Sequence, residues 1–298
     1  MNRKILVIGE ALIDDIFDKS TEEKEQKVGG SPLNIAVTAS RLGSSVQFLS
    51  SFTNDDLGKK IQRHLEESNV EILNNPCSIK KTSVAYATLD LNHNSTYTFD
   101  LDYQLPEKIE SIKEIDLSKI NLIHFGSLSA YLSETFEATR RFIEFSHNLK
   151  DTLVSFDPNI RPDIIPNKET VRKMTDQYLP FVDILKMSDE DKEWIYGNDD
   201  FQKPVLTVIT HGSEGAEVYL FGDKLGIFPT EKVKVVDTIG AGDSFMGALV
   251  NKIAEAGDKI LQIKNVDKIK EYINFANKVA GITVSRAGAN PPWAKEIR

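Results

Sequence analysis

The stretch Asp237-Thr-Ile-Gly-Ala-Gly-Asp243 combines two glycines with a carboxylate at a point where a helix is expected to begin. Apolar residues recur at helical spacing after it, and a β-branched run precedes it, so the stretch reads as a strand-to-helix turn. The first N–H groups of a helix lack intrahelical partners, and the helix dipole favours negative charge there. The bare backbone at Gly240 and Gly242 therefore predicts an anion-binding turn.

Asp243 lies on the same turn. A carboxylate beside a bound anion is electrostatically unfavourable unless it accepts a proton from a group that attacks that anion. In this interpretation Asp243 is a general base; the alternative is a tight turn in which Asp243 only caps the helix. The dinucleotide fingerprint Gly-x-Gly-x-x-Gly is not met, because Phe245 occupies the third glycine position, and the chain contains no P-loop motif.

The composition is that of a globular protein with an acidic balance. The chain has 298 residues, a formal net charge of −9 and a pI of about 5.2, which weighs against a nucleic-acid partner. Cys77 is the single cysteine, so an intrachain disulfide and a cysteine-rich zinc site are excluded. Neither an apolar run of membrane-spanning length nor a signal-peptide pattern is present in the sequence, and we expect a cytoplasmic location without membrane association.

Apolar runs alternate with segments of helical periodicity, which favours a mostly parallel sheet covered by helices. The last two expected strands look antiparallel. Strands are expected at 4–9, 46–50, 122–126, 153–157, 182–185, 205–209, 216–221 and 232–236, and helices after Gly30, at 57–67, 133–148 and 170–179, after Gly240, and at 267–285.

Two segments interrupt this rhythm. Residues 82–90 and 95–99 alternate in polarity like a half-exposed hairpin with its turn at 92–94. Together with part of 11–28, they predict a small antiparallel lid, formed by about 11–28 and 82–105, on a single domain spanning 1–298.

Polar residues follow several expected strands, at the edge of the sheet where open α/β folds bind ligands. Asn34 lies in the first turn of the helix that follows Gly30, and its amide offers both donors and acceptors to a sugar hydroxyl. Helix capping is the alternative role for Asn34. The other candidates at this edge are Asp14, Asn159 with Arg161, Lys186 to Asp191, Thr210 to Gly215, and Gly240 to Asp243.

Two segments resemble the signatures of the ribokinase-like (PfkB) carbohydrate kinases. Gly29-Gly-Ser-Pro-Leu-Asn34 through Gly43 resembles the first signature, and Asp237 to Asp243 resembles the second. Asp157-Pro-Asn-Ile-Arg161 and Phe125-Gly-Ser-Leu128 are most similar to the bacterial fructokinase branch. The resemblance covers essentially the whole chain and implies a ribokinase-like three-layer α/β/α sandwich with a mostly parallel central sheet and a small antiparallel β lid.

The resemblance also implies roles for individual residues. Asp243 would take the proton of the sugar hydroxyl, while the N–H groups of the preceding turn would face the transferred phosphate of ATP. The implied residues are Gly240, Ala241 and Gly242 for phosphate; Arg161 for phosphate or substrate; Asp14, Gly29, Gly30 and Asn34 for the sugar; and Lys186, Ser188, Thr210, Gly212, Gly215 and Asn277 for the nucleotide. Asn159, at the end of its strand, and Phe99, with its apolar ring in the lid, are further candidates for the sugar.

Two cations are implied as well. The family's Asn-x-x-Glu motif, tied to Mg²⁺, reads Ser188-Asp-Glu-Asp191 in this chain, which makes Asp191 the implied metal residue, with Glu190 as its alternative. Polar oxygen donors of this kind could hold a hydrated Mg²⁺ through water. A monovalent cation, K⁺, is implied near Asp237 and the backbone at Gly288.

The lid composition bears on the acceptor. From Ser83 to Pro106 there is no Lys or Arg, and three Asp residues are present, so a sugar carboxylate would find no counter-charge there. This favours a neutral ketohexose such as fructose. The alternatives are a kinase for 2-keto-3-deoxygluconate, ribose or a nucleoside, or a sugar or nucleotide sensor without activity. Exposed sheet edges are usually covered, and we expect a homodimer through residues 83–105.

Overall fold

The computed structural model describes residues 4–90, 95–149, 151–257 and 265–297. Its main sheet has the strand order β13-β12-β11-β10-β9-β8-β1-β4-β5. Strand pairing is parallel from β5 to β11 and antiparallel for β12 and β13. The strands are β1 (Lys4–Ile8), β4 (Ser45–Leu49), β5 (Glu71–Ile72), β8 (Ile120–Gly126), β9 (Leu153–Asp157), β10 (Ile184–Ser188), β11 (Leu206–Thr210), β12 (Ala216–Leu220) and β13 (Asp223–Phe228).

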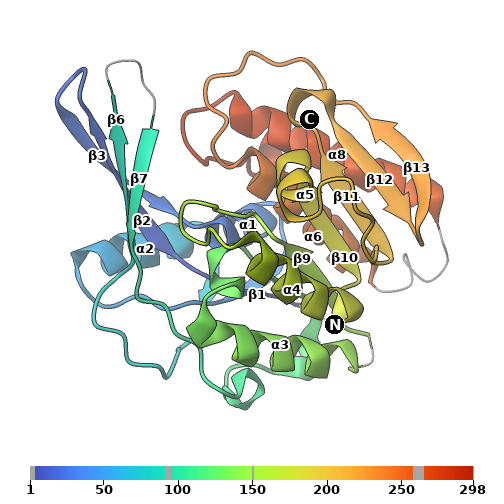
Figure 1. Cartoon of the computed structure of the whole chain (residues 1–298), viewed down its shortest axis with the longest axis horizontal. Helices are drawn as coiled ribbons and strands as arrows, with labels where there is room; N and C mark the ends of the chain where they lie inside the picture. Colours follow the sequence, from blue (N-terminus) through green and yellow to red (C-terminus); the bar gives the residue numbers. More distant parts are fainter. Residues whose placement is uncertain (1–3, 91–94, 150, 258–264, 298) are drawn as a thin grey trace.

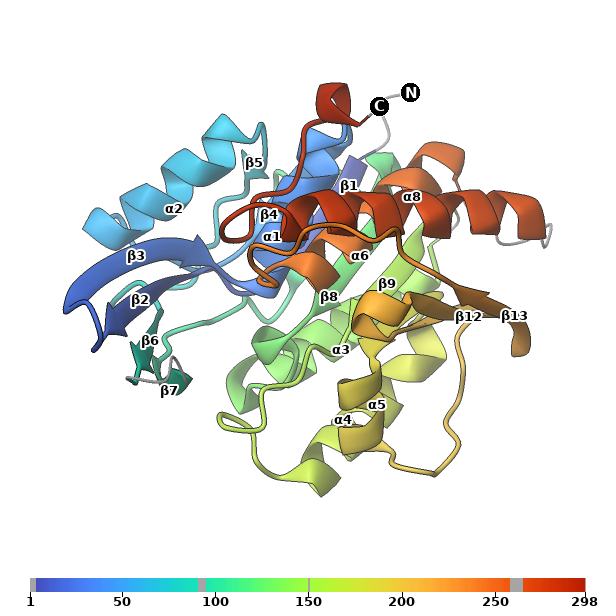
Figure 2. The ribbon, with the colours of Figure 1, turned by 90° about the horizontal axis from the view of Figure 1, so that it is seen from above.

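Helices cover both faces of this sheet, giving the predicted three layers (Figure 2). Alternate residues of one strand point to opposite faces, and β1 shows this directly. Ile5 and Val7 join the core beneath α1, α6 and α8, whereas Leu6 and Ile8 join the core on the side of α3 and α4. The helices are α1 (Ser31–Arg41), α2 (Asp56–Glu67), α3 (Ser133–His147), α4 (Lys168–Tyr178), α5 (Asp189–Ile195), α6 (Ala241–Ala256) and α8 (Val266–Val284).

A second sheet of four strands stands away from this body (Figure 1). Its order is β3-β2-β6-β7, with β2 (Leu12–Asp18), β3 (Glu23–Gly29), β6 (Val84–Leu89) and β7 (Ser95–Asp100). The two outer pairs are antiparallel, as expected, but the central pair of β2 with β6 is parallel, because these strands come from separate excursions of the chain. The turn expected at 92–94 lies outside the described residues.

The strand expected at 232–236 is wrong. This segment leaves the sheet and runs beside the end of α8, where the N–H groups of Val236 and Asp237 both donate to the carbonyl of Val284. The valines of this segment remain exposed, so its β-branched residues do not mark a strand of the sheet. The antiparallel partner of β12 is instead β13, a strand that the sequence reading missed.

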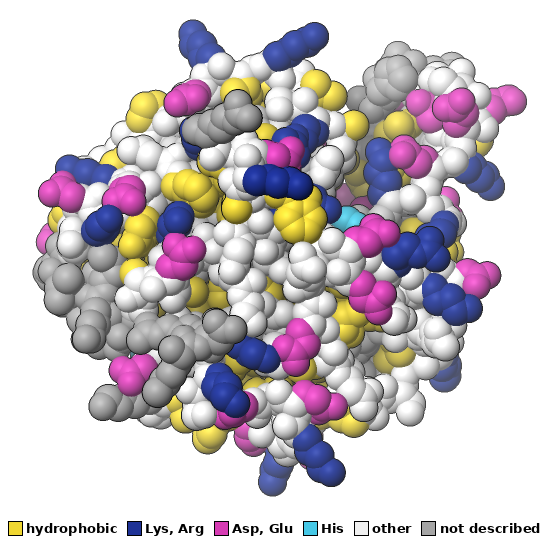
Figure 3. All heavy atoms as spheres, turned by 180° about the vertical axis from the view of Figure 1, so that it is seen from behind, with side chains coloured by type: hydrophobic (Ala, Val, Ile, Leu, Met, Phe, Trp, Pro, Cys, Tyr) yellow, Lys and Arg dark blue, Asp and Glu magenta, His cyan; other side chains and the backbone are white. Residues whose placement is uncertain are grey.

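The surface carries charges of both signs. On the face shown in Figure 3, Lys and Arg side chains are interspersed with Asp and Glu, unlike the continuous basic surface that binds a phosphate backbone. None of the helices in the described ranges is both long and apolar enough to cross a bilayer.

Candidate active site

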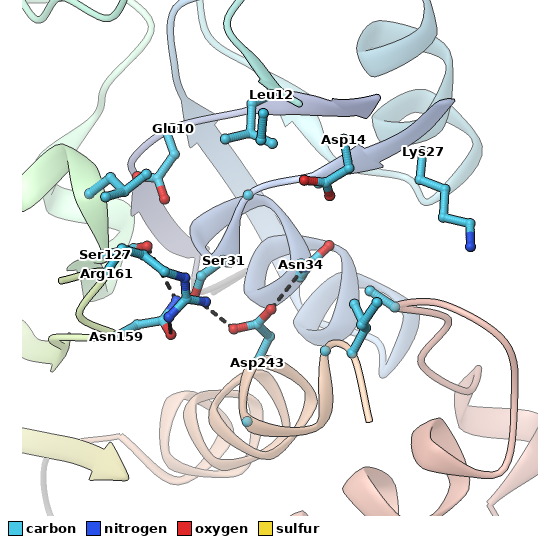
Figure 4. A pocket seen from close by; sticks show the side chains of 18 of the residues that line it. Glu10, Leu12, Asp14, Lys27, Ser31, Asn34, Ser127, Asn159, Arg161 and Asp243 are labelled. Carbon is cyan, nitrogen blue, oxygen red and sulfur yellow. Dashed lines mark hydrogen bonds between the residues drawn. The ribbon is translucent and has the colours of Figure 1, made fainter. Parts of the chain in front are cut away.

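A cavity of about 480 Å³ lies between the second sheet and the carboxyl ends of the central strands. Figure 4 shows that its walls come from β2, the start of α1, the loops after β8 and β9, and the start of α6. Twelve of the residues implicated by the sequence line it: Asp14, Gly29, Gly30, Asn34, Phe99, Asn159, Arg161, Lys186, Gly240, Ala241, Gly242 and Asp243.

Asp243 is held by two side chains from α1. Ser31 Oγ donates to one carboxylate oxygen at 2.7 Å, and Asn34 Nδ2 donates to the other at 2.8 Å (Figure 4). The carboxylate is therefore fixed at the cavity rather than folded back as a helix cap. Ser31 was missed as a site residue by the sequence reading, although it lies inside the Gly29–Asn34 segment.

The turn before Asp243 needs glycine for a steric reason. Gly240 has φ +76°, and a Cβ there would stand 2.6 Å from the Cβ of Ala289. A Cβ on Gly242 would stand 2.9 Å from Lys186 Nζ. The N–H groups that open α6 therefore face the cavity from a backbone that lacks side chains at both glycines, as an anion site requires.

The start of α1 forms the opposite wall. Gly30 adopts φ +110°, and a Cβ there would meet the carbonyl oxygen of Glu10 at 2.6 Å. A Cβ on Gly29 would stand 2.2 Å from Asp14 Oδ2. The two glycines thus let the strand β2 with its Asp14 carboxylate approach the helix closely.

Asp14 occupies a mixed electrostatic environment. Burial raises the pKa of Asp14 to about 6, while the positive charges of Arg161 and Lys27 act in the opposite direction. Arg161 is oriented by its own loop, donating from Nη1 to Asn159 Oδ1 at 2.8 Å and to the Ile160 carbonyl at 3.0 Å. Asn159 in turn donates to Ser127 Oγ at 3.2 Å from a backbone with φ +40°.

Two buried acids near the cavity were not among the expected site residues. Glu10 is 3% exposed and accepts the backbone N–H of Ser129; burial raises the pKa of Glu10 against the effect of its hydrogen bonds. Asp157 is fully buried and accepts from Lys186 Nζ at 2.9 Å. Neither pairing could be read from the sequence, because each joins residues on separate strands or loops.

The second sheet contributes an aromatic wall. Tyr97 and Phe99 lie on the same face of β7 and stack with ring centroids 6.0 Å apart. Together with Ala85 and Ala87 of β6 they line the cavity, and they offer an apolar surface without a charge.

Except for Lys186, the residues implied for the nucleotide lie outside the cavity lining. Thr210 ends β11, and Gly212 to Gly215 form the tight turn that leads into β12. A Cβ on Gly215 would stand 2.1 Å from the Phe228 carbonyl. Asn277 of α8 donates to the carbonyls of Phe228 and Pro229, so its amide nitrogen fixes the chain after β13.

Asp191 also has a structural role at the start of α5, and its assignment as a metal residue stays a prediction. One oxygen of Asp191 accepts the N–H of Ile160 and the other accepts the N–H of Ser188, while Ser188 Oγ accepts the N–H of Asp191. Ser188 and Asp191 therefore form a capping box at the start of α5. In the described part of the chain, no three His, Cys, Asp or Glu side chains gather as a metal site.

The structure brings Asp237 and Gly288 together. Asp237 Oδ2 accepts the N–H of Gly288 at 2.8 Å, and Oδ1 accepts the N–H of Ile239 at 3.0 Å. This tie holds the C-terminal loop beside the turn that precedes α6.

Comparison with known proteins places these features in one family. Residues 2–296 match the model of the pfkB family carbohydrate kinases. A fructokinase of Rhizobium leguminosarum bv. trifolii is 32% identical over 285 residues, covering 90% of this chain and 84% of that protein. Fructokinase-1 of Oryza sativa subsp. japonica is 28% identical over 287 residues, covering 90% and 86%. The crystal structure of a fructokinase from Xylella fastidiosa with bound ATP superposes with a TM-score of 0.85 at 25% identity, covering 97% of this chain and 94% of that one.

Proposed function

This chain belongs to the pfkB family of carbohydrate kinases, and from that premise we propose that it transfers the γ-phosphate of ATP to a hydroxyl of a neutral ketohexose, with fructose as the preferred acceptor. The observation that carries the proposal is the carboxylate of Asp243, fixed by Ser31 and Asn34 at 2.7 and 2.8 Å beside the bare turn at Gly240 and Gly242. This arrangement places a general base next to an anion-binding turn.

The chemistry follows from this juxtaposition. Asp243 accepts the proton of the acceptor hydroxyl while the oxygen of that hydroxyl forms a bond to the γ-phosphorus. The bond from that phosphorus to the bridging oxygen of ADP breaks. Phosphoryl transfer depends mainly on positioning and charge stabilisation. The N–H groups at the start of α6 supply fixed positive partial charge to the phosphoryl oxygens.

ATP as the donor is supported by the ATP complex of the Xylella fastidiosa fructokinase. Mg²⁺ supplies charge neutralisation on the phosphates when it is bound. Both oxygens of Asp191 accept one backbone N–H each and keep a further lone pair, so we propose that Asp191 would hold a hydrated Mg²⁺ through water. Mg²⁺ is commonly held mainly by substrate phosphates and water. For a monovalent activator such as K⁺, we propose the loop that joins Asp237 to Gly288.

The charges around the cavity support a neutral acceptor. The lid wall formed by Ala85, Ala87, Tyr97 and Phe99 carries no cation, and it suits the C–H face of a sugar. Lys27 and Arg161 do reach the cavity, but the Asp14 carboxylate lies within the electrostatic influence of both. A sugar carboxylate would therefore meet Asp14 together with these cations.

The test is a panel of acceptors assayed by ADP release at saturating ATP, with ADP release in the absence of acceptor subtracted. Fructose, 2-keto-3-deoxygluconate, ribose and a nucleoside make up the panel. We expect fructose to give much the highest kcat/KM. A preference for the acid sugar would contradict the charge argument, and Lys27→Met and Arg161→Met would then identify its partner. Binding of sugar and ATP without turnover of any acceptor would indicate a sensor.

We also propose a homodimer through residues 83–105. The strands β3 and β7 are the edges of the second sheet, and Tyr86 on β6 is 44% exposed. Exposed edges and aromatic side chains of this kind favour association. Sedimentation velocity at assay concentrations tests this idea, which a monomer would rule out.

A further inference from the structure

A row of polar side chains crosses the central strands beneath the start of α6. His124 on β8 contacts Ser155 on β9 at 2.9 Å, and Asp157, two residues further along β9, pairs with Lys186 on β10 at 2.9 Å. The side chains of Lys186 and Asp157 are 6% and 0% exposed. Of the ion pairs that the described residues form, this is the deepest.

The stability of the fold does not by itself explain why this ion pair is buried at this position. Removing two charges from water costs more than their attraction returns in many proteins, so a buried ion pair is weak evidence for stability. The Lys186 ammonium also lies at the start of α6, where the helix dipole is positive and a cation is repelled. A cation at this point becomes favourable when an anion occupies the adjacent turn.

The hydrogen-bond partners of the Asp157 carboxylate differ from those of a helix-capping acid such as Asp191. Asp191 gives both oxygens to backbone N–H groups. Asp157 gives Oδ2 to Lys186, and its Oδ1 has no hydrogen-bond partner although it is buried. Among the described residues, the side-chain hydrogen bond of Asp157 is thus directed at one ammonium group.

We propose that Asp157 is a positioning residue, which holds the Lys186 ammonium beneath the Gly240–Gly242 turn so that Lys186 acts on the transferred phosphoryl group. The inference rests on the proposed kinase function. In the empty site Asp157 offsets the repulsion between Lys186 and the helix dipole. When phosphate occupies the turn, Lys186 adds a full charge to the partial charges of the backbone.

The ionisation of Lys186 is consistent with this role. Burial alone would lower the pKa of Lys186, but the negative charges of Asp157 and Asp191 raise it above its ordinary value. The ammonium is therefore charged throughout the physiological pH range.

A double-mutant cycle tests the proposal in the full-length enzyme. Lys186→Met, Asp157→Asn and the double variant keep side-chain volume nearly constant, and each is assayed with ATP and the best acceptor. Removing a single charge-stabilising group commonly costs about 10²–10³-fold in kcat. We expect that loss for Lys186→Met, and a loss of at least about tenfold for Asp157→Asn, with little change in KM for the sugar.

The decisive comparison is between Lys186→Met and the double variant. If Asp157 acts through Lys186, their kcat values agree within about threefold, because Asp157 has nothing left to position. Losses that multiply, or an Asp157→Asn enzyme with normal kcat and only a lowered Tm, would overturn the proposal. Should Asp157→Asn fail to fold with its unpaired ammonium, the comparison of the other two variants still decides.

Ser155→Ala serves as the control. It removes a fully buried hydroxyl from the same strand, whose hydrogen bonds go to His124 and the Ile123 carbonyl, and it should change Tm without changing kcat. Wild-type turnover separates the two levels of inference: an inactive wild type contradicts the kinase function, whereas an active wild type with an additive cycle contradicts only the role of Asp157.

Discussion

Asn34 and Asp243, 209 residues apart in the sequence, are joined by a hydrogen bond of 2.8 Å between Nδ2 and a carboxylate oxygen. The bond links the first turn of α1 to the first turn of α6. It therefore fixes the wall of the cavity formed by α1 relative to the turn at Gly240 and Gly242, and the packing of the two helices determines whether it forms.

These two helices pack closely at Gly247. A Cβ there would stand 2.5 Å from Thr38 Cβ and 2.9 Å from the carbonyl oxygen of Ile35, inside a buried contact. We predict that Gly247→Ala lowers the free energy of unfolding by about 1–3 kcal/mol, because overpacking forces the helices apart. It should also lower kcat by displacing Asn34 from Asp243. Urea unfolding and steady-state kinetics measure the two effects.

Gly281→Ala is the matched control in α8. A Cβ there would meet only Val233 at 3.6 Å, an ordinary contact. Because alanine favours a helix over glycine by about 0.5–1 kcal/mol, this variant should be as stable as wild type or more so. A loss of stability equal to that of Gly247→Ala would show that helical glycines matter here for another reason.

Ser31 orients the other oxygen of Asp243. We predict that Ser31→Ala lowers kcat by about tenfold, since a charge-assisted hydrogen bond contributes about 1.5–3 kcal/mol, while the protein folds normally. Ser40→Ala, which removes a hydroxyl from the same helix that donates to the Asn69 carbonyl, should leave kcat unchanged. Equal activity of both variants would mean that Ser31 does not orient the base.

Asp14 should confer a pH dependence on sugar binding. With its pKa raised to about 6 by burial, Asp14 loses its charge as the pH falls through that value and accepts hydroxyl hydrogen bonds less well. We predict that KM for the sugar rises below about pH 6. In Asp14→Asn, KM should be higher at every pH and nearly constant between pH 5 and 8. A wild-type KM that stays flat over this range contradicts the role.

Protonation of Asp14 at low pH weakens sugar binding but has the opposite effect on the stability of the fold. Because the folded pKa of Asp14 lies above its ordinary value of 3.8, ionised Asp14 disfavours the fold above about pH 6, and this cost disappears below about pH 3.8. A rise in KM at low pH therefore cannot be attributed to loss of the fold through Asp14.

Site residues could be predicted from the sequence where their position depends on the local backbone. Gly30 and Gly240 start helices whose bare turns are readable from glycine spacing, and Asn34 and Asp243 lie on those turns. The strand expected at 232–236 failed because β-branched residues predict extended backbone without specifying a partner. The Asp157–Lys186 pair and the contact of Asp191 with the Ile160 N–H are tertiary, so the sequence could not specify them. The nucleotide role of Lys186 and the metal role of Asp191 stay predictions.

The most direct measurement is the kinetics and binding of Asp243→Asn. With fructose and ATP, we expect kcat to fall by about 10²–10⁴-fold, the usual contribution of a general base. Isothermal titration should give dissociation constants for both ligands within a few-fold of wild type, and circular dichroism should show the native fold. If kcat fell only a few-fold in a normally folded protein, Asp243 would be a helix-terminal acid and not the base.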